Sequence, residues 1–118
     1  MHRIMRQLPL LLEKVVKICK VDQNGAVHFE SGRLNNSEKI KSALAARFLA
    51  NKLEPKIRRE MTVKEISESL GIPKNIISAT LKEIKDQRVA FTSSKGDYSI
   101  YPYQIATLLD KLSQKYGK

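Results

Sequence analysis

The chain has few of the residues that carry covalent, redox or metal chemistry. Its 118 residues include one cysteine, Cys19, which excludes an intramolecular disulfide and a cysteine-based metal site. The pattern places Cys19 on an apolar face, where a buried structural thiol is expected. His2 and His28 lie far from any carboxylate cluster, and no Gly-rich phosphate loop or nucleophile elbow is present. We therefore expect no enzymatic activity and no bound metal or cofactor.

Long apolar runs are also missing. The run at residues 8–12 is interrupted by Pro9 and followed at once by Glu13. It is too short to span a membrane, and no small-residue cleavage site follows it, as one would after a signal peptide. Its apolar spacing predicts a short helix over residues 7–16 instead, with Pro9 in the first turn. We expect a cytoplasmic protein, associated with the nucleoid if it binds DNA.

Acidic residues are outnumbered by basic ones. There are 22 Lys and Arg against 12 Asp and Glu, which gives a formal net charge of +10. Such an excess favours a polyanionic partner, with nucleic acid first and an anionic membrane surface second, although a solvating Lys-rich surface is the alternative. Hydrophobic residues make up 42% of the chain, enough for one core.

Residues 1–36 are expected to add a β-hairpin to the N-terminal helix. A turn signal, DQNG, occupies residues 22–25. A three-residue loop would pair Val21 with Val27 and Cys19 with Phe29, which puts all four apolar side chains on one face. A two-residue loop would mix apolar and polar residues on each face, so the first register is preferred.

A second unit is expected over residues 37–118 and begins with a long helix. Ser37 is in position to cap a helix over residues 38–53. Its apolar face would carry Ile40, Leu44 and Phe48, and the dipeptide before Pro55 would end it.

Residues 62–86 predict two helices joined by a tight turn. Thr62 and Glu65 form a capping box for a helix of two turns with Val63, Ile66 and Leu70 buried. A glycine at 71 closes this helix in the left-handed conformation, the isoleucine after it fills the corner, and the proline at 73 starts the second helix.

The second helix has an apolar and a polar side. Ile77, Leu81 and Ile84 recur at helical spacing and are expected to be buried. The opposite side carries small and polar residues with lysines around them: Lys74, Asn75, Ser78, Ala79, Lys82, Lys85 and Asp86. Such a side suits the major groove, because small residues permit close approach, Asn and Ser bond base edges, and lysines meet phosphates. An ordinary solvated face is the alternative.

A hairpin is expected directly after this helix. Residues 88–92 and 98–101 are β-prone and flank a turn over residues 93–97. Phe48 and Phe91 are interpreted as core residues. The turn contains two serines, Lys95 and a glycine, so its tip could reach a phosphate backbone or the minor groove.

The stretch from about residue 37 to 101 resembles the winged helix-turn-helix superfamily, in the style of small archaeal transcription-regulator-like members. The resemblance rests on residues 62–73 (TVKEISESLGIP), 77–84 (ISATLKEI) and 96–100 (GDYSI). It implies an α+β, mostly helical fold in which residues 73–86 form the recognition helix and residues 93–96 the wing tip. One departure is that this helix lacks arginine, the commonest reader of guanine.

Residues after Pro102 predict an amphipathic C-terminal helix. Its apolar positions follow a helical period: Ile105, Leu108, Leu109, Leu112 and Tyr116. Two uses of this stripe are open, namely packing on the core of the chain or pairing with a second copy in a homodimer.

These features predict a double-stranded DNA-binding protein, either a transcriptional regulator or a chromosome-associated protein. The residues expected to contact DNA lie on the second helix, in the hairpin and just before the helix pair: Lys56, Arg58, Arg59, Lys74, Asn75, Ser78, Ala79, Lys82, Lys85, Arg88, Ser94 and Lys95.

Two other functions remain open. A protein-interaction adaptor in a transcription or RNA-processing complex would expose the hairpin residues Val21, Val27 and Phe29 or the C-terminal stripe as an apolar patch. RNA binding would need exposed aromatics for base stacking, and only 6% of the residues are aromatic. The candidates for stacking are the tyrosines at 98, 101 and 103.

Overall fold

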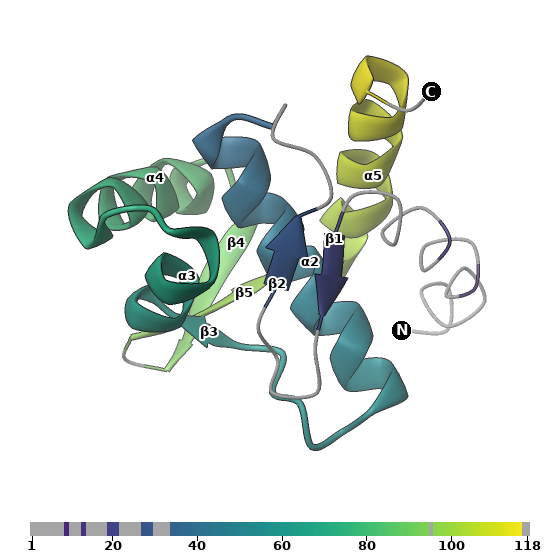
Figure 1. The fold of residues 1–118 in the computed structure, drawn as a ribbon, viewed down its shortest axis with the longest axis horizontal. Helices are drawn as coiled ribbons and strands as arrows, with labels where there is room; N and C mark the ends of the chain where they lie inside the picture. The colour runs from purple at the N-terminus through teal and green to yellow at the C-terminus, as the bar shows by residue number, and fades with distance from the viewer. Residues whose placement is uncertain are drawn as a thin grey trace.

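The fold is α+β and mostly helical, and a computed structural model describes residues 9, 13, 19–21, 27–29, 34–94 and 96–116. These residues form four helices and a three-stranded antiparallel sheet, with a separate two-stranded ribbon (Figure 1). Of the helix expected over residues 7–16, only Pro9 and Glu13 are described, and the hairpin loop 23–25 lies outside the described residues.

The longest helix, α2 (Asn36–Leu53), begins two residues before the expected start. Its cap is Asn35 and not Ser37, so that prediction was wrong. The Asn35 side chain accepts the Glu38 N–H at 2.8 Å, and the Glu38 carboxylate accepts the Asn35 N–H at 2.9 Å. This reciprocal box satisfies two backbone donors. A cap at Ser37 would have put Ile40, which has no acceptor, at the reciprocating position.

Helices α3 (Val63–Leu70) and α4 (Lys74–Asp86) follow, joined by three residues. The predicted capping box is confirmed, because the Thr62 hydroxyl accepts the Glu65 N–H at 3.1 Å and the Glu65 carboxylate accepts the Thr62 N–H at 3.2 Å. Gly71 ends α3 with φ of +69°, as expected. Pro73 is the N-cap of α4, one position before the first helical residue at which it was expected.

The sheet has the order β3–β5–β4, with both pairs antiparallel. It consists of β3 (Met61–Thr62), β4 (Ala90–Ser94) and β5 (Asp97–Ile100). The expected hairpin is therefore present, with strands shifted by up to two residues and a tighter turn. The two-residue strand β3 had not been predicted. It brings the start of α3 beside the first residues of β5.

One hydrophobic core joins these elements around α2, which contacts α3, α4, β5 and the C-terminal helix α5 (Pro102–Tyr116). Figure 1 shows α3 and α4 on one side of α2 and α5 on the other. The largest fully buried side chains come from every one of these helices and from β3 and β5: Ile40, Leu44, Phe48, Leu49, Met61, Ile66, Ile77, Leu81, Ile84, Ile100, Ile105 and Leu109. Val63 and Leu70, expected to be buried, are half-buried at its margin.

The C-terminal stripe belongs to this core. Ile105 and Leu109 are fully buried, and Leu108 and Leu112 retain no more than 8% of their exposure. Packing on the chain's own core, one of the two expected uses of the stripe, is thus observed for these four residues. The side chain of Tyr116 lies outside the described residues.

The N-terminal ribbon pairs β1 (Cys19–Val21) with β2 (Val27–Phe29) in the preferred register. Cys19 is opposite Phe29, and Val21 is opposite Val27. This register is confirmed. The ribbon lies against α2, and β2 also lies beside α3 (Figure 1). The orientation of its side chains, on which the expectation of a buried thiol at Cys19 depended, is outside the described part of the chain.

Candidate nucleic-acid interface

The exposed side of α4 gathers six of the predicted contact residues. Ile77, Leu81 and Ile84 are fully buried and fix the rotation of the helix about its axis. All the residues expected on the other side are exposed: Lys74, Asn75, Ser78, Ala79, Lys82, Lys85 and Asp86. A continuous polar strip about four helical turns long therefore faces solvent.

The lysines of this strip are available to an anion. Within the described part of the chain, no ion pair engages Lys74, Lys82 or Lys85. The helix also carries Glu83 and Asp86, both exposed, so its formal balance is three lysines against two acids. The positive potential of this surface thus depends on the positions of the three lysines along α4 and on basic residues outside the helix.

Arg88 is a basic residue just beyond the end of α4, and its backbone conformation is unusual. It is the one described non-glycine residue with positive φ, at +61°. Its N–H donates to the Lys85 carbonyl, and the Val89 N–H donates to the Ile84 carbonyl, both at 3.0 Å. These two bonds form a Schellman motif that closes α4, and glycine is the residue usually found at this left-handed position. An arginine there costs about 1 kcal/mol relative to glycine.

We therefore expect Arg88→Gly to stabilise the protein by about 1 kcal/mol, because glycine adopts the left-handed conformation without steric strain. Urea denaturation of the free protein measures this effect. Arg88→Ala is the matched control, because it removes the same charge but keeps the strain, and its stability should stay near that of the unmodified chain. A glycine variant less stable than the alanine variant would contradict the assignment of strain.

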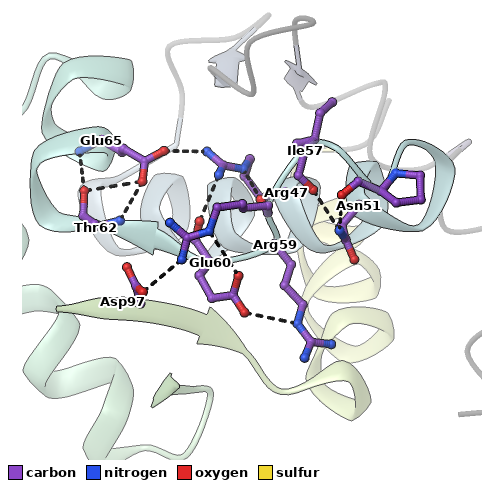
Figure 2. Close-up of polar contacts among 10 residues, drawn as sticks. Arg47, Asn51, Ile57, Arg59, Glu60, Thr62, Glu65 and Asp97 are labelled. Atoms are coloured by element: carbon purple, nitrogen blue, oxygen red, sulfur yellow. Dashed lines mark hydrogen bonds and ion pairs between the residues drawn. The ribbon is translucent and has the colours of Figure 1, made fainter. Parts of the chain in front are cut away.

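A buried arginine that had not been predicted from the sequence holds the segment before α3. Arg47 of α2 is 4% exposed. Its Nε donates to the Arg58 carbonyl at 2.6 Å, its Nη2 to the Glu60 carbonyl at 2.9 Å, and its Nη1 to the Glu65 carboxylate at 3.1 Å. Figure 2 shows this arginine between the connecting segment and the capping box of α3. One signal was available, because position 47 falls on the apolar side of α2, seven residues after Ile40.

The three cations predicted before the helix pair differ in their surroundings. Lys56 is exposed. Arg58 donates from Nη2 to the Asp97 carboxylate at 2.9 Å, and this hydrogen bond and the charge of Asp97 raise the pKa of its guanidinium above the ordinary value. Arg59 approaches Glu60 at 3.4 Å and lies over the ring of Phe48. Arg58 and Arg59 therefore share their charge with neighbouring carboxylates, and the partner of Arg58 is the first residue of β5, beside the turn of the β4–β5 hairpin.

The tip of that hairpin is only partly described. Ser94 pairs with Asp97 after an irregularity in the ladder between Thr92 and Ser94. Gly96 has φ of +84°, which closes the turn. The side chain of Ser94 and all of Lys95 lie outside the described residues. The two strands of the hairpin are described. They follow α4 in the chain, and β5 pairs with β3.

Phe91 was wrongly interpreted as a core residue. It is half-buried and stacks on Tyr101 with ring centroids 4.7 Å apart, and Tyr101 stacks on Tyr103 at 5.4 Å. Tyr103 is 65% exposed, and its hydroxyl lies 3.5 Å from the Arg88 carbonyl. The reason is the alternation of the strand, since Ala90 points into the core and its neighbour Phe91 must point away. Phe48, by contrast, is buried as expected.

The described residues give no support for a metal site or for a membrane-spanning helix. Among them, no three His, Cys, Asp or Glu side chains come together in a way that could hold a metal ion. No helix in that part of the chain is both long and apolar enough to cross a membrane.

In comparisons with protein-family models, curated proteins and solved structures, the chain matched none. Its function is therefore inferred from its own residues and their arrangement.

Proposed function

We propose that the chain is a double-stranded DNA-binding protein of the winged helix-turn-helix class, without enzymatic activity or a cofactor. Helix α4 lies in the major groove as the recognition helix, and the β4–β5 hairpin, as the wing, contacts the backbone or the minor groove. The order of helices and strands and the sheet order β3–β5–β4 are in keeping with this class. A transcriptional regulator and a chromosome-associated protein both fit this activity.

One observation carries the proposal. The exposed side of α4 combines small side chains, Ser78 and Ala79, with lysines that have no ion-pair partner among the described residues. Arg88 follows at the end of the helix, in a backbone conformation that costs stability. A solvated surface needs no such cost, whereas a phosphate contact beside the groove accounts for it.

The alternative function, a protein-interaction adaptor, was expected to expose an apolar patch on either the N-terminal hairpin or the C-terminal stripe. The four described apolar side chains of the C-terminal stripe are buried in the chain's own core and form no exposed apolar patch. The remaining large apolar side chains that are exposed in the described residues, Leu53, Ile76 and Tyr103, lie on three different helices. The proposal requires only one copy of the chain, although pairing of two copies on DNA is compatible with it.

Fluorescence anisotropy tests the proposal directly. A labelled duplex of random sequence is titrated with the protein at several salt concentrations, against single-stranded DNA and RNA of equal length. If six to ten phosphates are contacted, affinity for the duplex should fall about 10³- to 10⁵-fold between roughly 50 and 200 mM salt. Absence of duplex binding at low salt would refute the proposal and favour the adaptor. Preference for the single strands would direct attention to the tyrosines near α5.

A further inference from the structure

An apolar spot lies within the polar side of α4. Ile76, in the first turn of the helix, keeps 38% of its exposure, although it belongs to a helix whose other isoleucines are fully buried. Ala79 follows three residues later and is exposed beside it. Asn75 and Lys74 stand on the same turn, and Lys82 one turn beyond, all exposed.

This mixture of side chains matches one feature of duplex DNA. The major-groove edge of a base pair carries a single apolar group, the C5-methyl group of thymine. That methyl group lies near the phosphates of the backbone, and exposed lysines precede and follow Ile76 and Ala79 along the helix, at positions 74 and 82. The partner of a thymine is adenine, whose N6 and N7 atoms are bonded by asparagine side chains. Asn75 lies four residues before Ala79, on the same exposed face of the helix. The helix has no arginine, the commonest reader of guanine, and its lysines are assigned to phosphates.

We propose that α4 recognises thymine methyl groups through Ile76 and Ala79, which gives the protein a preference for sites rich in A·T pairs. The position in the helix is suitable, because residues of the first turns of a recognition helix are those that contact base edges. The inference rests on the proposed function, since it assigns a base preference to the same helix.

The test uses bases that differ by one methyl group. Uracil is thymine without the methyl group, and 5-methylcytosine adds a methyl group to cytosine at the corresponding place. Affinities are measured by anisotropy for an A·T-rich duplex, the same duplex with uracil for thymine, a G·C duplex, and that duplex with 5-methylcytosine. Loss of each buried methyl contact should weaken binding about fourfold, and methylation of cytosine should recover part of it.

Two variants assign the effect to the helix. Ile76→Ala should weaken binding to the thymine duplex and lower the thymine-to-uracil affinity ratio, leaving only the part that Ala79 contributes. Leu53→Ala is the matched control, because Leu53 is also an exposed apolar residue, at 62%, and ends the separate helix α2. This control should leave the ratio unchanged, and circular dichroism confirms that both variants are folded.

The outcomes separate the two proposals. Salt-dependent duplex binding with equal affinity for thymine and uracil duplexes would overturn the methyl contact and leave the DNA-binding proposal standing. An unchanged ratio in Ile76→Ala would also overturn it, because the discrimination would then come from another part of the chain. No binding to any duplex would overturn both.

Discussion

Replacing Lys74 and Lys82 together with glutamate should weaken duplex binding about 10²-fold at low salt, because two phosphate contacts are lost. Each lysine is exposed on α4 and has no ion-pair partner within the described residues. Each phosphate contact that is lost should also lower the slope of log affinity against log salt by about one. Because both positions face solvent, the reversal should leave the folded core intact.

Matched single substitutions show whether the position of the charge matters. Lys82→Glu and Lys111→Glu change the net charge equally, but Lys111 is exposed on α5, across α2 from α4 (Figure 1). At 0.1 M salt, charges separated by more than about 10 Å are largely screened, so Lys111→Glu should change affinity much less than Lys82→Glu. Equal losses of affinity in the two variants would mean that binding depends on net charge alone. That result would contradict the assignment of α4 to the major groove.

The second large effect concerns stability. Arg47→Met should lower the free energy of unfolding by about 3 kcal/mol, because it leaves two part-buried carbonyls and the Glu65 carboxylate without their charged donor. The value is at the lower end for a broken buried pair, since Glu65 is 39% exposed and can be solvated. Urea denaturation followed by circular dichroism provides the measurement.

Arg59→Met is the control for this substitution. Arg59 lies in the same connecting segment and approaches Glu60 at 3.4 Å, but its side chain is 43% exposed. Surface pairs contribute at most about 1 kcal/mol, so the loss should be small. If the two variants lost the same stability, Arg47 would not hold the connecting segment as its contacts indicate.

Most of the local structure could be predicted because it depends on neighbours in the chain. The Thr62–Glu65 capping box and the end of α3 at Gly71 each involve residues no more than four positions apart. Caps and apolar periods of this kind are written in residue spacing. The same locality explains the error at α2, where two capping residues compete and only Asn35 has a glutamate three positions later.

The β-register was predictable for a related reason. In any antiparallel pair, a slip by one residue moves the side chains of one strand to the opposite face relative to its partner, so the apolar pattern of the sequence selected one pairing between β1 and β2. The candidate interface was predictable to the same extent. Periodicity alone put Ile77, Leu81 and Ile84 inside, and the opposite side of α4 had to be exposed.

The sequence by itself therefore determined the helices, their caps, the polar side of α4 and its excess of lysine over arginine. Tertiary structure decided the contacts between distant residues. Arg47 bonds Glu65, 18 residues away, and Arg58 bonds Asp97, 39 residues away. Likewise, the short strand β3 exists because β5 pairs with it. Such contacts leave no period in the sequence, because they arise only when packing of the core brings separate segments together.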